Sequence, residues 1–238
     1  IDKASKQGGG QVVIPEGHWQ SGRIELKSNV ELHLAEGCEL HFSGRIEDYL
    51  PVVFTRDEGF EILSLGSFIY ANNQENIAIT GQGKIVGPST DCEIYQINQE
   101  KAINIEKIVF PDTPMSERVF DGKQRNGEVF LPKSIAPIRC KNVLIEGVTI
   151  EQGLYWNVVP QYCENVIIRG VTVNSFGHGR TDGIDVESSK NVLIEYCSLD
   201  CQDDCYTMKS GRNVEGVRIG IPTENVVVRH CLALRGAG

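Results

Sequence analysis

The chain has 238 residues, of which 40% are hydrophobic, and a formal net charge of -9. This length and apolar content suit one sizeable domain with a hydrophobic core, or part of a larger one. The negative charge argues against a nucleic-acid binder, because phosphate contacts need an excess of Lys and Arg. A protein with this net negative charge would bind an anionic polymer only in a cleft that is locally basic. No apolar run is long enough to span a membrane.

The first residues, IDKASKQGGG, are typical of the last turns of a helix followed by a glycine turn. We therefore expect at most a short helix over Ile1 to Gln7, and a chain that begins inside a domain. Because of that beginning, the absence of a signal peptide says little about localisation.

A short repeat led by asparagine dominates the rest of the chain. Its clear copies start 23, 26 and 34 residues apart, so one coil takes about two dozen residues with insertions at particular turns. This period, with Val and Ile alternating against polar residues, predicts an all-β right-handed parallel β-helix, a solenoid that we expect to be truncated at both ends. Asparagine suits a stacked turn with unusual dihedrals. The clear copies are Asn142-VLIEGVTI, Asn165-VIIRGVTV, Asn191-VLIEYCSL and Asn225-VVVRHCLA, and the weaker ones are Asn29-VELHLAEG and Asn76-IAITGQGKI.

Two segments interrupt the repeat within what we expect to be a single β-helix domain over residues 1–238. Residues 88–135 are polar, charged and contain several prolines, and residues 211–224 form a smaller excursion. No helical pattern of the length that a β/α barrel needs is present. Loops of a solenoid often gather on one face and shape a groove, and simple tolerance of insertion is the alternative.

The eight cysteines include no zinc-type CxxC pair. Cys140 and Cys163 both stand two residues before the Asn of a repeat, whereas Cys197 and Cys231 both stand six residues after one. Equivalent positions in successive coils stack, so we predict free thiols in an internal ladder rather than disulfides.

Three carboxylates mark the candidate site. Asp182 lies within Thr-Asp-Gly, and the adjacent pair Asp203 and Asp204 begins 21 residues later, a spacing of one coil. Carboxylates crowded on neighbouring strands raise at least one pKa, the condition for a general acid beside a general base. An isolated Asp-Asp is more often structural. The pair can share a site only if the strand ends or bulges near Cys201 and Gln202, because adjacent strand residues point to opposite faces.

The same residues resemble a known family. Three segments resemble the bacterial polygalacturonases, which are pectin-degrading enzymes of glycoside hydrolase family 28. The segments are Thr181-Asp182-Gly183-Ile184-Asp185, Asp203-Asp204-Cys205 and Lys209-Ser210-Gly211-Arg212-Asn213. The similarity extends from GGGQVVIPEGHW near the start, through NIAITGQGKIVG, to the end. The family's motifs run Asn-Thr-Asp, Asp-Asp, Gly-His-Gly and Arg-Ile-Lys, and only the first two can be assigned here.

The third motif has two imperfect matches. Gly177-His178-Gly179 spells it but precedes Asp182, so it is not given that role. Gly236-Ala237-Gly238 stands where the motif is expected, with Ala237 in place of the histidine. The Arg-Ile-Lys motif would lie beyond residue 238.

The resemblance implies an inverting glycoside hydrolase that cleaves galacturonate-containing, pectic polysaccharide or oligosaccharide. Asp203 would be the general acid, and Asp182 and Asp204 would activate water. The resemblance implies no cofactor and no metal, no nucleic-acid or membrane partner, a monomer, and a secreted or periplasmic location.

Basic residues near the acids are candidate contacts for a uronate carboxylate. Lys209 and Arg212 follow the acid pair, and arginine can bind a carboxylate through two hydrogen bonds. Arg180, which stands where the family has Asn, and His178 complete this substrate-binding set. Ordinary surface charge is the alternative for each.

Two other functions stay open. Ala237 favours a β-helix that binds pectin without cleaving it, and a calcium-dependent polysaccharide lyase of similar fold would use an Arg base. Hydrolysis yields reducing ends without absorbance at about 235 nm, elimination yields that absorbance, and pure binding yields neither. Tyr155 and Trp156, one coil before the acids, either offer a stacking face for a sugar or are buried.

Overall fold

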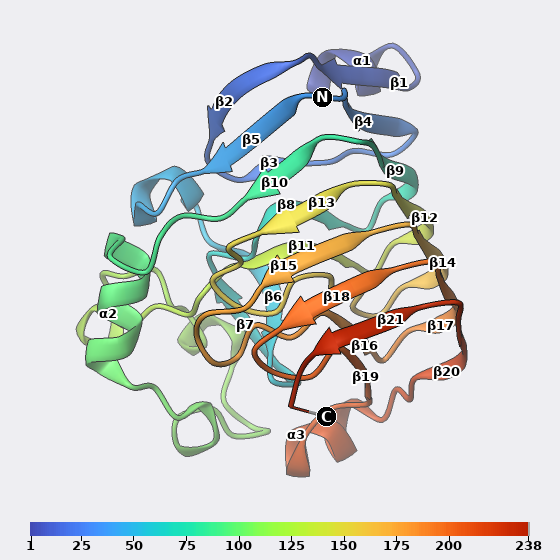
Figure 1. Cartoon of the computed structure of the whole chain (residues 1–238). Helices are drawn as coiled ribbons and strands as arrows, with labels where there is room; N and C mark the ends of the chain where they lie inside the picture. Colours follow the sequence, from blue (N-terminus) through green and yellow to red (C-terminus); the bar gives the residue numbers. More distant parts are fainter. Residues whose placement is uncertain (238) are drawn as a thin grey trace.

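The computed structural model describes residues 1–237, which form coils of parallel strands stacked along one axis (Figure 1). The chain is a right-handed parallel β-helix, as the repeat predicts. One face is a seven-stranded sheet of β1 (Gly10–Ile14), β4 (Val30–Leu34), β9 (Glu75–Gly81), β12 (Lys141–Glu146), β14 (Glu164–Arg169), β17 (Lys190–Glu195) and β20 (Glu224–Arg229). The second is a seven-stranded sheet of β2 (Gly17–Ser21), β5 (Cys38–Phe42), β10 (Lys84–Val86), β13 (Thr149–Glu151), β15 (Thr172–Ser175), β18 (Ser198–Cys201) and β21 (Leu232–Arg235).

A third face is made of shorter strands. Isolated bridges through Val158 and Gln161 join its two sheets into one surface. An antiparallel hairpin projects beside it and turns at Glu58 and Gly59, whose φ angles are 44° and 89°. The third face holds β3 (Ile24–Glu25), β8 (Ser67–Asn72), β11 (Lys133–Ile138), β16 (Ile184–Glu187) and β19 (Tyr206–Lys209), and the hairpin holds β6 (Val53–Asp57) and β7 (Phe60–Ser64).

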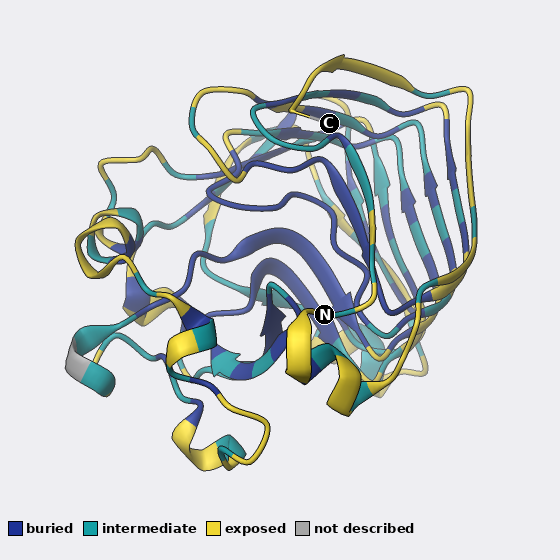
Figure 2. Ribbon diagram, turned by 90° about the horizontal axis from the view of Figure 1, so that it is seen from below, coloured by how far each residue is buried: buried dark blue, intermediate teal, exposed yellow. Residues whose placement is uncertain are grey.

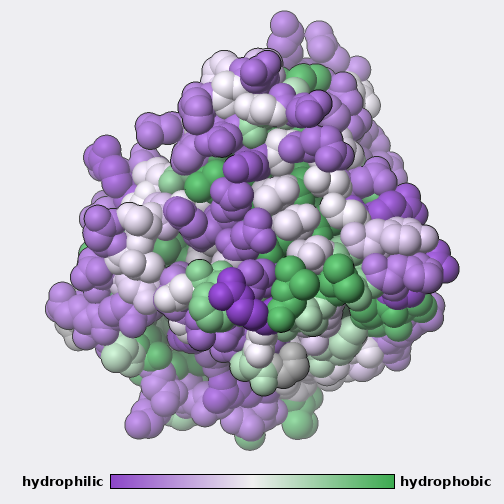
Figure 3. Space-filling view, in the orientation of Figure 1, coloured by the Kyte–Doolittle hydropathy of each residue, from purple (hydrophilic) through white to green (hydrophobic). Residues whose placement is uncertain are grey.

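Ladders of aliphatic side chains fill the interior. Ile79, Ile145, Ile168 and Ile194 are register partners in successive coils, and none is more than 3% exposed. Each such burial stabilises the fold by about 1.5–3 kcal/mol. Figure 2, a view along the stack, shows the buried inner strands inside an exposed outer edge. Figure 3 shows a mostly hydrophilic outer face, with apolar side chains gathered toward the last coils.

The asparagines that lead the repeats form a second ladder at the start of the strands of the first sheet. Their φ angles lie between 52° and 63°, the left-handed region that asparagine tolerates. From the second member on, each side-chain amide donates to the Oδ1 atom of the asparagine in the preceding coil, at 2.8–3.1 Å. The members are Asn29, Asn76, Asn142, Asn165, Asn191 and Asn225.

The helices lie outside the coils. The predicted short helix at the start is α1 (Asp2–Lys6), but the sequence analysis missed two others, because both excursions are partly helical. None in residues 1–237 is long and apolar enough to cross a membrane. The first excursion ends sooner than predicted, since residues 133–135 already belong to β11, and Glu224 already belongs to β20. The remaining helices are α2 (Glu93–Lys101), α3 (Asn213–Ile219), η1 (Ile46–Tyr49), η2 (Ile105–Lys107), η3 (Met115–Glu117) and η4 (Arg125–Gly127).

The hairpin, the first excursion and α3 pack together. Phe60 on β7 and Phe120 in the excursion belong to a small hydrophobic cluster separate from the main core. A buried ion pair joins Arg118 in the excursion to Glu215 on α3 at 2.7 Å, and Arg118 also donates to the carbonyl oxygen of Glu61 at 3.2 Å. These three insertions therefore form one wall beside the third face.

All eight cysteines lie within the described part of the chain, and all eight are free. Cys140 and Cys163 are fully or almost fully buried, and burial raises the pKa of the Cys163 thiol. The prediction of free thiols is confirmed.

The asparagine ladder yields a first prediction. Asn165→Ala removes a hydrogen bond to Asn142, another from Asn191, and the side chain that tolerates a φ of 59°. We expect the free energy of unfolding to fall by about 1–3 kcal/mol, measured by chemical denaturation followed by circular dichroism. Asn165→Gly keeps the backbone conformation and should lose less. A change within about 0.5 kcal/mol in Asn165→Ala would contradict a stabilising ladder.

Candidate active site

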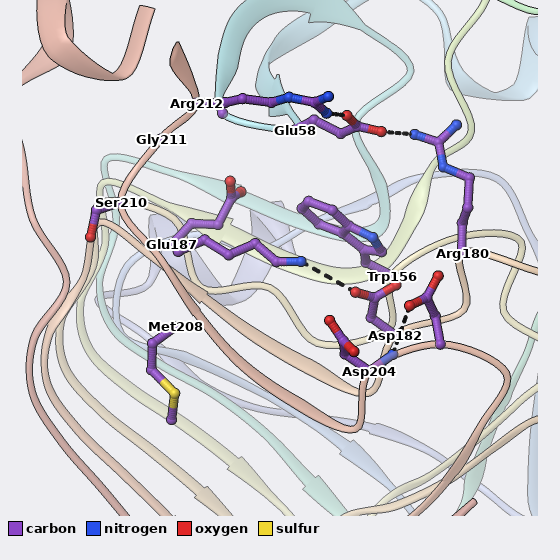
Figure 4. Close-up of a pocket in the computed structure, with 13 residues that line it drawn as sticks. Glu58, Trp156, Arg180, Asp182, Glu187, Asp204, Met208, Ser210, Gly211 and Arg212 are labelled. Atoms are coloured by element: carbon purple, nitrogen blue, oxygen red, sulfur yellow. Dashed lines mark hydrogen bonds and ion pairs between the residues drawn. The ribbon is translucent and has the colours of Figure 1, made fainter. Parts of the chain in front are cut away.

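A pocket of about 510 Å³ opens between the third face and the wall of insertions (Figure 4). Its residues come from the hairpin tip, the segment before β16, the turn between β18 and β19, and the end of β19. It is lined by Glu58, Gly59, Trp156, Arg180, Asp182, Glu187, Asp203, Asp204, Met208, Lys209, Ser210, Gly211 and Arg212.

The three predicted carboxylates converge in this pocket. One oxygen each of Asp182, Asp203 and Asp204 lies within 4.8 Å of the others. Strand β18 ends at Cys201, so the adjacent pair stands on a turn and is free of strand alternation. The Asp204 amide donates to Asp203 Oδ1 at 3.0 Å and fixes the turn. The expectation of a strand end before the pair is confirmed.

A glycine brings the two acidic segments together. The Gly183 amide donates to the carbonyl oxygen of Asp204 at 2.9 Å. A Cβ atom at Gly183 would lie 2.5 Å from the carbonyl oxygen of Cys205, so no other residue fits without a backbone shift. Glycine after Asp182 is therefore a requirement of the close approach.

Lys209 places a positive charge beside the buried carboxylates at the base of the pocket. Its Nζ atom lies 3.2 Å from Asp182 Oδ2, 3.0 Å from Asp185 Oδ1 and 4.0 Å from the ring centroid of Trp156. Asp185 also accepts a hydrogen bond from the Thr207 hydroxyl. The lysine thus stabilises charge on two buried carboxylates.

Burial and crowding nevertheless shift both acids toward the protonated form. Burial raises the pKa of Asp182 to about 6, with Lys209 opposing and Asp203 adding to the rise. Burial and the charge of Asp182 raise the pKa of Asp185 to about 8. The direction of the Asp182 shift agrees with the prediction of a raised pKa in the carboxylate group, but its main cause is burial, and the charges of Asp203 and Asp204 add less.

Two arginines meet at the mouth of the pocket. Arg180 and Arg212 both form ion pairs with Glu58 at the hairpin tip, as Figure 4 shows. Arg180 also donates to the Tyr155 hydroxyl at 3.1 Å, and Arg212 Nε lies 2.6 Å from Glu106. Both arginine side chains remain nearly half exposed, at 47% and 46%, so they can meet a ligand.

The remaining predicted residues lie in different places. His178 does not line the described pocket, since its Nε2 faces the Gly153 carbonyl at 3.0 Å and its ring contacts Tyr95. The Ala237 amide donates to the Asp203 carbonyl at 3.2 Å, so this position borders the acid pair. Trp156 is 6% exposed and lines the pocket, whereas Tyr155 is 1% exposed and buried.

The sequence analysis missed several lining residues. The sequence did contain a signal for Glu58 and Gly59. A two-residue segment that includes glycine and stands between two β-rich runs predicts a hairpin. Asp185, three residues after Asp182, does not line the pocket but shares Lys209 with Asp182, and it was quoted without a role. Glu187 is fully buried and accepts a hydrogen bond from Gln161, which only the coil register could indicate.

Carboxyl groups that can act as acid and as base in an open pocket are what glycosidic-bond hydrolysis requires. The chain belongs to glycosyl hydrolases family 28, whose family model matches residues 6–221. The resemblance seen in the motifs is thereby confirmed.

Individual relatives agree with the family. A crystal structure of a hyperthermoactive exopolygalacturonase from Thermotoga maritima is 37% identical, with a TM-score of 0.83, and covers 97% of this chain and 55% of that chain. A curated relative from Vitis vinifera, named "Probable polygalacturonase", is 26% identical over 96% of this chain and 43% of its own length. A polygalacturonase from Erwinia carotovora shares the fold, with 20% identity and a TM-score of 0.66. The chain thus spans about half the length of these relatives.

The shifted pKa of Asp185 yields a second prediction. The pKa of Asp185 is about 8 in the folded protein and 3.8 in the unfolded chain. The contribution of this carboxyl group to the free energy of unfolding is therefore lost as the pH rises from about 4 to about 8. Asp185→Asn keeps an oxygen for Thr207 and Lys209 but cannot ionise. Relative to the parent protein, the variant should gain stability across that range, by at most about 1.4 kcal/mol per pH unit. Parallel urea denaturation curves from pH 4 to pH 8, with a constant difference, would refute the shift.

Proposed function

We propose that this protein hydrolyses glycosidic bonds in galacturonate-containing, pectic polysaccharide or oligosaccharide. The observation that carries the proposal is the convergence of Asp182, Asp203 and Asp204, within 4.8 Å, in an open pocket of a family 28 chain. Hydrolysis needs one protonated and one ionised carboxyl group at the same bond. Burial raises the pKa of Asp182 to about 6, so one carboxyl group of the cluster can change its protonation state close to neutral pH.

We assign the roles as follows. Asp203 donates a proton to the leaving glycosidic oxygen, and Asp182 and Asp204 together hold and deprotonate the attacking water. Lys209 keeps Asp182 ionised when the pH exceeds about 6. Trp156 forms part of the pocket floor, with the lysine ammonium over its ring.

The substrate class rests on charge and on the relatives. Two matched relatives that each cover at least 96% of this chain carry polygalacturonase and exopolygalacturonase in their names. Arg180, Lys209 and Arg212 are the cations of a pocket that also holds five carboxylates. A uronate carboxylate would approach the exposed faces of the two arginines. Because such polymers are too large to enter a cell, we also propose that the enzyme is secreted or periplasmic. We further propose that it is a monomer.

The spacing of the carboxylates differs from that of most inverting enzymes, although the family resemblance implies inversion. Inverting pairs usually stand about 6.5–9.5 Å apart, leaving room for water between them. The cluster here is tighter, with one oxygen of each group within 4.8 Å. We propose inversion, with the attacking water held jointly by Asp182 and Asp204 on the face of the sugar opposite the leaving oxygen that Asp203 protonates.

Product analysis tests both the reaction class and its stereochemistry, and is the third prediction. Polygalacturonate should yield new reducing ends without absorbance at about 235 nm, and proton NMR should detect first the anomer opposite to the bond cleaved. The retained anomer would refute the joint-water arrangement. Absorbance at that wavelength would replace the proposal by a calcium-dependent lyase, and retention on pectin without products by a binding module.

The role of Asp203 gives the fourth prediction. Asp203→Asn keeps the side-chain shape but removes the proton, and should lower kcat by about 10²- to 10⁴-fold. An aryl glycoside with a very good leaving group needs little protonation, so this variant should regain activity on it. Asp182→Asn and Asp204→Asn are the matched controls and should not regain activity. Equal losses for all three variants on both substrates would contradict the assignment.

Ala237 sets the background for that comparison. Its amide contacts the Asp203 carbonyl, at the position where the family resemblance expects a histidine. If the chain has too little activity to measure, the Asp203 series is made in Ala237→His. A gain of activity on that single change would assign the third motif to residues 236–238.

A further inference from the structure

A second group of potential metal ligands stands on β2 and β5. Figure 1 shows these strands at the opposite end of the stack from β16 and β19. His18 stands on β2, and Glu39 and His41 stand on β5. One ligand atom of each lies within 4.8 Å of the others. His18 Nδ1 is 3.1 Å and His41 Nε2 is 3.3 Å from the same oxygen, Oε2 of Glu39.

The strand register produces this cluster. β2 pairs in parallel with β5, which sets His18 beside Glu39 and Gln20 beside His41. Glu39 and His41 are two residues apart on one strand, so they point to the same face. All three side chains therefore project from the outer face of the second sheet, where ions in solution can reach them, and His18 is 79% exposed.

The distances match those of a tetrahedral metal centre. Zinc binds imidazole nitrogen and carboxylate oxygen at about 2.0–2.2 Å, so two ligand atoms of a tetrahedral site lie about 3.3 Å apart. The two nitrogen-to-oxygen distances in the cluster, 3.1 Å and 3.3 Å, are already of that size. A cation that replaces the proton shared by His41 and Glu39 would not require the strands to move, and the His18 side chain, 79% exposed, has room to turn toward it.

We propose that His18, Glu39 and His41 form a binding site for a divalent transition metal ion, represented by zinc, with water at the fourth position. Two imidazoles and one carboxylate suit a borderline-soft cation, whereas calcium prefers oxygen ligands alone. Lys84 does not compete for the ligand oxygen, because its Nζ lies 3.8 Å from Oε1, the other oxygen of Glu39.

Metal binding would brace the first coil. β2 is the edge strand of the second sheet and has no buried residue. It is joined to the stack through its pairing with β5, so a shared metal ion adds a direct link between the two strands. Binding to the folded state alone raises the free energy of unfolding with the logarithm of the ligand concentration once that concentration exceeds Kd.

The test, our fifth prediction, is a zinc titration of the full chain after chelator treatment. Calorimetry should detect one saturable zinc ion per chain in the parent protein, and zinc should raise Tm. His18→Ala and His41→Ala should each weaken binding at least tenfold and abolish the rise in Tm. Equimolar calcium should not displace zinc. The readouts do not use enzymatic activity, so the result is independent of the proposed hydrolase function.

His33→Ala is the matched control. His33 is also a strand histidine, but its Nδ1 lies 2.7 Å from Thr80 and 3.7 Å from Glu31, with no second imidazole in its cluster. The His33→Ala variant should bind zinc with the same affinity as the parent protein. The site is refuted if the parent shows no saturable binding, or if His18→Ala and His41→Ala bind with unchanged affinity. Zinc that survives both substitutions would have to bind elsewhere, for instance at the three aspartates, and would also count against the proposal.

Discussion

The parallel register between β16 and β19 is the constraint on which the site depends. It sets Asp185 beside Thr207 and Glu187 beside Lys209, and the hydrogen bond from Gly183 to Asp204 extends the same pairing one step beyond the strands. Carboxylates one coil apart in sequence thereby become neighbours in space. A slip of one residue would turn Lys209 to the opposite face and leave the acids without their cation. The long asparagine ladder contributes to the same order, because each of its hydrogen bonds is made only when successive coils are aligned.

The acids are held in a condition that a protein built for stability alone would avoid. Asp182 and Asp185 are buried with a single shared lysine, and each keeps one oxygen without a hydrogen-bond partner in the described structure. Burial therefore favours their protonated forms, against the attraction of Lys209. Strain of this kind persists where the surrounding fold enforces it, and ionisable groups with displaced pKa values are typical of functional sites.

The sequence was sufficient for features that repeat or that depend on coil length. The asparagine copies predicted the β-helix, and the 21-residue separation of Asp182 from Asp203 predicted their meeting. Features outside the repeat were harder. Helix α2 buries only Ile94 and Asn98, too few positions for an apolar period, and α3 buries only Glu215, whose partner Arg118 is remote in sequence. His178 was predicted to bind substrate, yet its Nε2 faces a backbone carbonyl and it does not line the pocket. Burial partners and ion pairs between insertions are set by tertiary packing, which a single sequence does not encode locally.

The ion pair between Arg118 and Glu215 has a consequence for the pocket. It joins two insertions that carry no ladder hydrogen bonds of the solenoid, and both side chains are almost fully enclosed. Removing either partner would leave an uncompensated buried charge, at a cost of about 3–5 kcal/mol. Neither residue lines the pocket, so a substitution at this enclosed contact would disturb the rim beside the acids from a distance.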